Sequence, residues 1–186
     1  MGSAGSDRRE ILTVGHSNHE ETDFLELLRG AGVDAVADVR RHPSSRRQPH
    51  FDRSALAASL KLSGIGYEWM GERLGGRREP NAGSPNDALD DAWARGYADH
   101  MGTEEFERGL AQLEQQSSGR RVAVMCAEAD WRRCHRRLIS DALLARGHRV
   151  SHLRETGAIE EHELTESAVI ESGRVSYPAA QTSLDV

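Results

Sequence analysis

Short, continuously apolar runs alternate with amphipathic segments along most of this chain, and no other feature constrains its fold as strongly. The runs that are typical of buried strands are residues 11–17, 33–40, 64–70, 121–128 and 148–153. Between them, apolar residues recur at the three- and four-residue spacing of an amphipathic helix. Continuous apolar strands joined through helices are typical of a parallel sheet that is covered on both faces. We therefore predict a three-layer α/β fold with a mostly parallel, five-stranded Rossmann-like sheet and helices on both faces.

The helices expected between these strands are residues 20–30, 52–63, 89–97, 106–113 and 138–147. Residues 71–87 are rich in Gly, Pro and Asn, which predicts an irregular surface loop. The apolar pattern weakens after Glu155, where we expect one surface helix near residues 162–170 and a mobile end.

The chain divides into three parts by composition. Residues 1–10 lack an apolar core, so we expect a disordered leader rather than a secretory signal. Residues 11–154 carry the alternating pattern and are predicted to form one α/β domain. Residues 155–186 are an acidic C-terminal extension, because Glu155 to Glu171 contains six acids and no Lys or Arg. Such a segment would repel an anion, so we expect it to lie away from the chemistry.

Nothing in the sequence predicts insertion into a membrane, because no apolar run approaches the roughly 20 residues that span a bilayer. Without an export signal, the chain is expected in the cytoplasm, where thiols stay reduced. A structural disulfide between Cys126 and Cys134, the two cysteines of the chain, is therefore not expected.

A basic loop follows the second predicted strand. Residues 40–50 contain four Arg, two His and no acid, in a chain whose formal net charge is -6. Guanidinium groups bind phosphate and carboxylate in a bidentate manner. We expect Arg40, Arg46 and Arg47 to bind an anion together with Ser17 and Arg136. The alternative is a solvated loop without a ligand.

Residues with chemical side chains stand at or just after several predicted strand ends. They are His16, Ser17, Asp38, Arg40, Cys126 and Glu128. Ligands of open parallel sheets bind outside the carboxyl ends of the strands, so we expect these residues to share one edge of the sheet. Of them, His16, Asp38, Arg40, Cys126 and Glu128 are expected to converge on one cleft together with Arg136. The candidate catalytic residues are His16, Cys126, Glu128 and His135, because imidazole, thiolate and carboxylate groups transfer protons or act as nucleophiles. Asp38 and Cys134 are expected to support them.

More than one interpretation of Cys126 is open. Cys126 and Arg132 match the Cys-x5-Arg loop of thiol phosphatases, but Glu128 and Asp130 stand between them and would repel a phosphate. Cys126 could instead be a small buried apolar residue, since free Cys is among the most buried residue types. Glu128 is either a general acid or base or the ion-pair partner of a nearby arginine.

A metal or haem group is the main alternative to an anionic substrate. Cys134 and His135 are adjacent, so on a helix their side chains would diverge by about 100°. We therefore expect them not to share one metal ion. A group that needs only one protein ligand, such as haem, could be bound by His16, Cys126 or His135. The sequence requires no cofactor, and it leaves haem and a transition metal open.

Five motifs follow one another between about residues 11 and 153: TVGHSN, DVRRHPSSRRQPHF, LGGRR, YADHM and CAEADWRRCHR with ALLARGHRVSHL after it. In this order they resemble the motifs of the DUF488 domain family of bacterial and archaeal proteins, whose name marks an unassigned function. The resemblance implies a fold and a site but no activity. By similarity the motif residues are Gly15, His16, Ser17, Asp38, Arg40, Ser45, Arg46, Phe51, Gly75, Gly76, Cys126, Glu128, Cys134, His135 and Arg136. Asp130-Trp131 departs from the Asp-Pro that the family often has.

These observations favour a cytoplasmic enzyme that acts by hydrolysis or transfer on an anionic substrate, such as a phosphate-bearing nucleotide or a nucleic-acid base. The first alternative is a metal- or haem-binding protein that uses His16, Cys126 or His135. The second is a nucleic-acid binding module, whose affinity would depend steeply on salt. The expected partner is a small anionic molecule or nucleotide, with nucleic acid as the second choice and no membrane. The sequence leaves the oligomeric state open.

Overall fold

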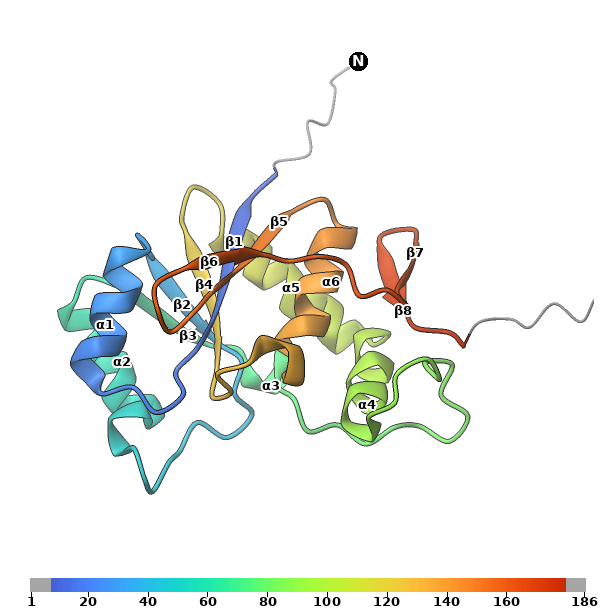
Figure 1. Cartoon of the computed structure of the whole chain (residues 1–186), viewed down its shortest axis with the longest axis horizontal. Helices are drawn as coiled ribbons and strands as arrows, with labels where there is room; N and C mark the ends of the chain where they lie inside the picture. The colour runs from blue at the N-terminus through green and yellow to red at the C-terminus, as the bar shows by residue number, and fades with distance from the viewer. Residues whose placement is uncertain (1–7, 180–186) are drawn as a thin grey trace, which may run out of the picture.

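The computed structural model describes residues 8–179, which form a six-stranded sheet with helices on both faces (Figure 1). The strands of this sheet are β1 (Glu10–Gly15), β2 (Ala35–Asp38), β3 (Gly66–Trp69), β4 (Val122–Cys126), β5 (Arg149–Leu153) and β6 (Ile159–Glu161). Their order is β3-β2-β4-β1-β5-β6, and β1 to β5 pair in parallel. The predicted mostly parallel, Rossmann-like α/β sheet is confirmed, although it has six strands rather than five.

Helices cover both faces of the sheet. They are α1 (Glu21–Gly30), α2 (Arg53–Leu62), α3 (Gly71–Leu74), α4 (Ala92–Met101), α5 (Glu104–Gln116) and α6 (Arg136–Ala145), with 3-10 turns η1 (Pro49–Phe51) and η2 (Trp131–Arg133). Neighbouring residues of β1 face opposite sides, as strand geometry requires. Leu12 belongs to a core with Phe24 and Leu56 of α1 and α2, whereas Ile11 belongs to a second core that includes Leu138 of α6. This arrangement gives the three predicted layers.

The helix predicted near residues 162–170 is absent: residues 162–168 are irregular, between a sixth strand and a small hairpin. β6 adds to the sheet edge antiparallel to β5, and β7 (Val169–Glu171) pairs antiparallel with β8 (Arg174–Ser176). Ser172 and Gly173 connect β7 to β8, and both have positive φ, at 51° and 77°. Two such residues between strands are typical of a type I′ hairpin turn. The helix prediction was wrong because this turn signal was overlooked.

The segment after β5 packs against the domain through Asp141 of α6. Asp141 is fully buried and accepts hydrogen bonds from Tyr177 Oη at 2.7 Å and from the Thr165 backbone N at 3.0 Å. His162 Nε2 lies 2.9 Å from the same carboxylate. Tyr177 is itself fully buried, so the acidic extension contributes to the core instead of forming only a surface helix.

The leader and the far C-terminal end of the extension lie largely outside the described residues. Glu10, which was assigned to the leader, is the first residue of β1. The loop expected over residues 71–87 begins with the short helix α3 and is irregular after it. Within the described part of the chain, no helix is both long enough and apolar enough to span a bilayer.

Candidate functional site

A pocket of about 550 Å³ opens at the carboxyl ends of β1, β2 and β4. Residues at or just after each of these strand ends line it: His16 follows β1, Arg40 follows β2, and Cys126 ends β4. Because the three strands are parallel neighbours, their ends meet at one edge of the sheet. The pocket lies at the edge where the sequence analysis placed the cleft.

The loop after β4 crosses the end of β1 at very short range. The backbone N of His16 donates to the carbonyl of Cys126 at 2.9 Å, and the N of Ser17 donates to that of Ala127 at 2.9 Å. A Cβ on Gly15 would lie 2.0 Å from the carbonyl oxygen of Glu128. A glycine at position 15 is therefore required for the Glu128 loop to pass over the strand and reach the pocket.

Arg40 and Asp38 form a buried ion pair beside the pocket. Arg40 donates from Nε to Asp38 Oδ1 at 2.9 Å and from a terminal nitrogen to Oδ2 at 2.6 Å. Its other terminal nitrogen donates to the carbonyl of Phe51 at 2.8 Å, and Tyr67 Oη donates to Asp38 at 2.7 Å. Burial, followed by the Asp38 charge, raises the pKa of Tyr67, which keeps this hydroxyl a donor. Asp38 thus neutralises Arg40 and fixes its position.

His16 is neutral and has both ring nitrogens engaged. Arg40 can only donate, so Nε2 of His16, 3.2 Å away, must accept. The proton is then on Nδ1, which donates to the carbonyl of Ser17 at 3.1 Å. The ring stacks on Phe51, with centroids 4.1 Å apart. Burial, followed by the Arg40 charge, lowers the pKa of His16 to about 4. His16 lies in the predicted cleft, with its ring nitrogens engaged by Arg40 and the carbonyl of Ser17, and its catalytic role stays a prediction.

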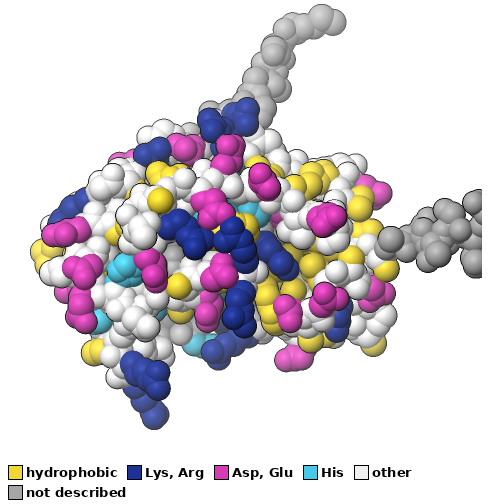
Figure 2. Space-filling view, in the orientation of Figure 1, with side chains coloured by type: hydrophobic (Ala, Val, Ile, Leu, Met, Phe, Trp, Pro, Cys, Tyr) yellow, Lys and Arg dark blue, Asp and Glu magenta, His cyan; other side chains and the backbone are white. Residues whose placement is uncertain are grey.

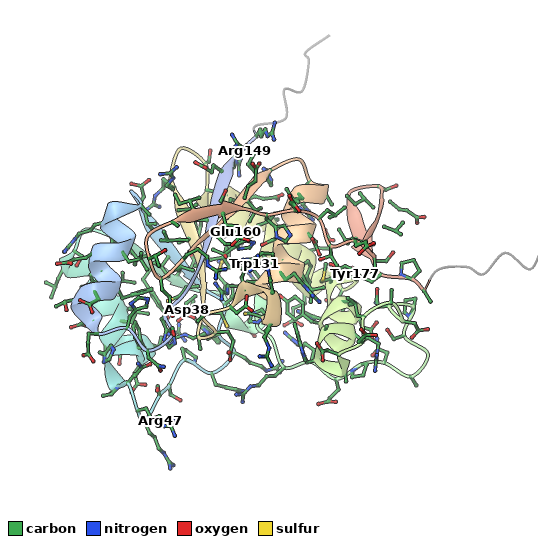
Figure 3. The ribbon with its side chains drawn as sticks, in the orientation of Figure 1. Asp38, Arg47, Trp131, Arg149, Glu160 and Tyr177 are labelled. Atoms are coloured by element: carbon green, nitrogen blue, oxygen red, sulfur yellow. The ribbon has the colours of Figure 1, made fainter. Side chains whose placement is uncertain are left out.

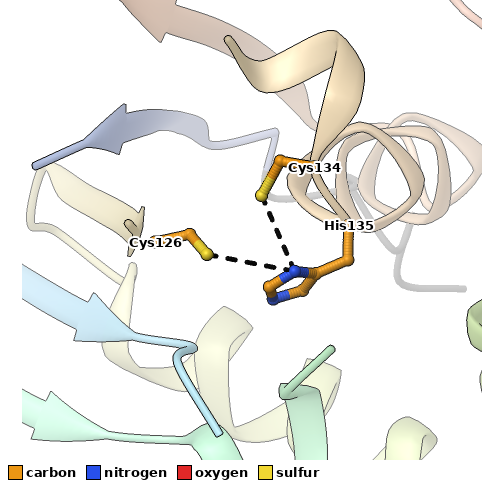
Figure 4. Close-up of side chains that lie close together, drawn as sticks. All are labelled: Cys126, Cys134 and His135. Carbon is orange, nitrogen blue, oxygen red and sulfur yellow. Dashed lines mark hydrogen bonds between the residues drawn. The ribbon is translucent and has the colours of Figure 1, made fainter. Parts of the chain in front are cut away.

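Cys126, Cys134 and His135 form a buried cluster (Figure 4), and all three line the pocket. Nδ1 of His135 lies 4.0 Å from the sulfur of Cys126 and 3.6 Å from that of Cys134. The two sulfurs and this nitrogen all lie within 4.8 Å of one another, and both cysteines are free thiols. Nε2 of His135 is 3.2 Å from the carbonyl of Val39, which accepts its proton. Nδ1 of His135 therefore faces the two sulfurs.

The expectation that Cys134 and His135 diverge is wrong. It assumed that both residues are inside a helix, but Cys134 is extended, with φ −131° and ψ 149°, and His135 is the N-cap of α6. The chain turns here from η2 into α6. This turn brings the adjacent side chains together against Cys126, which comes from a different element.

The two thiols differ in pKa. The hydrogen bond that Cys126 donates to Cys134, together with burial, raises the pKa of Cys126 well above its usual value. Burial opposes ionisation of Cys134, but the hydrogen bond from Cys126 and the proximity of His135 and Arg136 outweigh it and hold the pKa of Cys134 well below its usual value. Cys134 is therefore the more readily ionised of the two thiols.

Arg136 holds the loop instead of lining the pocket. It is 1% exposed, one terminal nitrogen donates to the carbonyl of Glu128, and Nε lies 3.5 Å from the sulfur of Cys134. Its predicted role was anion binding, but its guanidinium is directed at these internal acceptors. Glu128 itself is exposed and is the one acidic residue among the described residues that line the pocket.

The basic loop contributes to the pocket with different residues from those predicted. Arg46 and Arg47 are exposed and do not line it, and Figure 3 shows Arg47 at the tip of a projecting loop, away from Asp38. Figure 2 shows the same basic projection at the lower edge of the molecule. Ser17, with φ 47°, also does not line the pocket. The structure does not bring these three predicted anion ligands into the site.

The arginines that do line the pocket, besides Arg40, are Arg41, Arg77 and Arg133. None of the three was predicted as an anion ligand. Arg41 adjoins Arg40 in the basic loop, and Arg133 adjoins Cys134. Both could have been predicted as pocket residues from their position next to predicted site residues. Arg77 has φ 58°, an uncommon conformation for a residue with a side chain. It follows Gly75 and Gly76, which belong to the quoted LGGRR motif.

Comparison with known proteins identifies one family. The model of the family described as domain of unknown function DUF488 matches residues 21–143. This span includes the Cys126–Cys134–His135 cluster and the basic loop. No curated protein and no solved structure matches the chain.

Proposed function

The chain belongs to the DUF488 domain family, and we propose that it is an enzyme that binds a small anionic substrate in this pocket and acts on it by hydrolysis or group transfer. One observation carries the proposal: a buried Cys126–Cys134–His135 cluster lines a pocket whose other lining residues include arginines. Such an enzyme requires side chains that react with the substrate and cations that bind its negative charge, and the cluster and the arginines would supply them.

The charge of the pocket supports an anionic ligand. Arg41, Arg77 and Arg133 have no carboxylate partner among the described residues, whereas the charge of Arg40 is neutralised by Asp38. Glu128 is the single acid lining the pocket in the described residues, so positive charge is in excess. Guanidinium groups bind phosphate and carboxylate through paired hydrogen bonds, which suits a phosphate-bearing substrate.

The dimensions of the pocket support a small molecule. Its volume of about 550 Å³ is within the roughly 300–1,000 Å³ typical of small-molecule sites. Trp93 lines the same pocket and offers an aromatic surface on which a nucleobase could stack. A nucleotide, which combines a base with a phosphate, fits both features. Glu128 is in position to exchange a proton with such a substrate.

We also propose that the chain is located in the cytoplasm. Two free thiols lie within 4.8 Å of each other in the cluster, and a reducing compartment keeps such thiols from forming a disulfide.

Ligand titration by calorimetry tests the proposal. The full chain is titrated with inorganic phosphate, nucleoside monophosphates and single-stranded DNA. The double variant Arg41→Gln/Arg77→Gln removes two pocket cations, and Arg46→Gln/Arg47→Gln is the matched control because it removes two cations outside the pocket. We expect mononucleotide affinity to fall at least tenfold in the first variant and to stay unchanged in the second.

Two outcomes would contradict the proposal. One is the absence of binding for every small anion. The other is tight, salt-dependent DNA binding that requires Arg46 and Arg47 and not the pocket arginines, which would favour a nucleic-acid binding module.

A further inference from the structure

We propose that Cys126, Cys134 and His135 bind a zinc ion through two sulfurs and Nδ1, with the fourth coordination position open to the pocket. The metal site follows from side-chain geometry alone. The role of the open position in catalysis rests on the proposed function.

The spacing of the three ligand atoms matches tetrahedral zinc. Bond lengths of about 2.3 Å to sulfur and about 2.0–2.1 Å to nitrogen place neighbouring ligand atoms about 3.5–3.8 Å apart in a tetrahedron. Nδ1 of His135 is 3.6 Å from the sulfur of Cys134 and 4.0 Å from that of Cys126, and all three atoms lie within 4.8 Å of one another. Small side-chain movements would bring the set to zinc distances.

The surroundings orient the ligands as metal sites require. A metal-binding histidine usually donates its other ring N–H to a carbonyl or carboxylate, which fixes the tautomer. His135 does so through Nε2, which lies 3.2 Å from the carbonyl of Val39. Arg136 places Nε 3.5 Å from the sulfur of Cys134, where it stabilises negative charge on this ligand.

Gly76 keeps the cluster open on the pocket side. A Cβ at this position would lie 2.8 Å from Nδ1 of His135, the atom that would bind the metal. Gly76 and the three ligand residues all line the pocket, so the fourth position faces the cavity. Structural zinc sites are closed by four protein ligands, whereas catalytic sites have three and keep a position for water or substrate. The group found among the described residues has three members.

The donor set selects the metal. Two thiolates and an imidazole favour zinc or copper(I) over magnesium or calcium, which prefer oxygen ligands. Zinc carries no redox chemistry and suits hydrolysis or transfer, because it activates a bound water and polarises an oxygen of the substrate. Glu128, which lines the same pocket, would take the proton that the bound water releases.

Cobalt(II) substitution tests the site on the full chain. Metal-free protein with reduced thiols is titrated with cobalt(II) in the absence of oxygen. We expect one equivalent to bind, with thiolate-to-cobalt charge transfer and the strong visible bands of tetrahedral cobalt, and zinc to displace it. The ligand variants are Cys126→Ser, Cys134→Ser and His135→Gln. His42→Gln is the control, because His42 lines the pocket outside the cluster.

Each ligand variant should bind cobalt at least about tenfold more weakly, since even second-shell changes cost metal sites about that much, and His42→Gln should bind as the parent does. Circular dichroism of the metal-free variants separates loss of a ligand from loss of folding. The cobalt spectrum of the parent chain tests the site even if a variant does not fold. A parent chain that gives no tetrahedral spectrum would overturn the inference. So would a folded Cys134→Ser variant with unchanged affinity.

Failure of the inference and failure of the proposed function have different signatures. Cobalt binding without nucleotide or phosphate binding would leave the metal site standing and contradict the function. Nucleotide binding that depends on Arg41 and Arg77, in a chain without affinity for cobalt or zinc, would support the function and overturn the metal site.

Discussion

Cys126 and His135 are nine residues apart in sequence, yet the sulfur of Cys126 lies 4.0 Å from Nδ1 of His135. Cys126 is fixed by β4, which pairs with β1 and β2, and His135 is fixed by the start of α6. The loop between them is held by Arg136, which donates to the carbonyl of Glu128. The end of β4, the loop after it and the start of α6 therefore form one unit. A change that displaces the loop would also displace the residues of the cluster.

Replacement of Gly15 by Ala should displace the Glu128 loop and destabilise the fold. The added Cβ would lie 2.0 Å from a backbone oxygen that cannot move without the loop. Overpacking of this kind costs about 1–3 kcal/mol. Urea denaturation measures the loss. Gly30→Ala at the end of α1 is the matched control, because a Cβ there meets nothing within 4 Å. Equal stability of the two variants would contradict the close approach.

Replacement of Asp38 by Asn should be among the most damaging single changes beside the site. Asp38 is fully buried and pairs with Arg40, so the substitution leaves a buried arginine without its counter-charge. Such a loss costs about 3–5 kcal/mol. Glu10→Gln breaks the half-exposed pair with Arg121 and should cost less than about 1 kcal/mol. Denaturation curves that show similar losses for both would refute the structural role of the buried pair.

Removal of the segment after Leu153 should destabilise the domain severely, contrary to the expectation of a peripheral tail. Asp141 would lose three partners: Tyr177, Thr165 and His162. The milder Tyr177→Phe removes one hydrogen bond from a buried carboxylate and should cost about 1–3 kcal/mol. Truncation after Ala179 keeps all of these contacts and serves as the control. Unchanged thermal unfolding after truncation at Leu153 would show that the extension is dispensable.

Stability should fall as the pH falls below about 6.5. Burial, followed by the charge of His162, lowers the pKa of His152 to about 2, so this ring stays neutral in the folded chain and takes up a proton on unfolding. The unfolded state then binds more protons than the folded state between pH 6.5 and about 2, and stability rises with pH across that window.

The variant His152→Gln isolates this contribution. It should reduce the slope of unfolding free energy against pH by up to about 1.4 kcal/mol per pH unit. Guanidinium denaturation at several pH values measures the slope, which is independent of any constant loss caused by the substitution. A slope equal to that of the parent chain would show that His152 is not neutral in the fold.

The sheet could be predicted because short, mostly apolar runs alternate with amphipathic segments along the chain. The rule that ligands bind at strand ends then placed His16, Arg40 and Cys126 in one cleft. The hairpin after β6 was missed because Ser172 and Gly173 form a short turn inside an otherwise weak pattern. Such a turn depends on local backbone geometry, which the spacing of apolar residues does not reveal.

The site was predicted less completely. Arg46 and Arg47 were chosen by charge, but charge does not reveal whether a loop residue points inward or to solvent. Cys134 and His135 were placed on a helix because a helix was expected nearby, and the turn that precedes α6 brings them together instead. Only the three-dimensional path of the chain from η2 to α6 could reveal the complete cluster.

The most direct test is a crystal structure of the zinc-loaded chain soaked with phosphate, with anomalous diffraction recorded at the zinc edge. We expect one anomalous peak bonded to Cys126, Cys134 and His135, and a phosphate in the pocket in contact with Arg41 or Arg77. A Cys126–Cys134 disulfide in reduced crystals, or a metal and an anion bound elsewhere, would contradict this expectation.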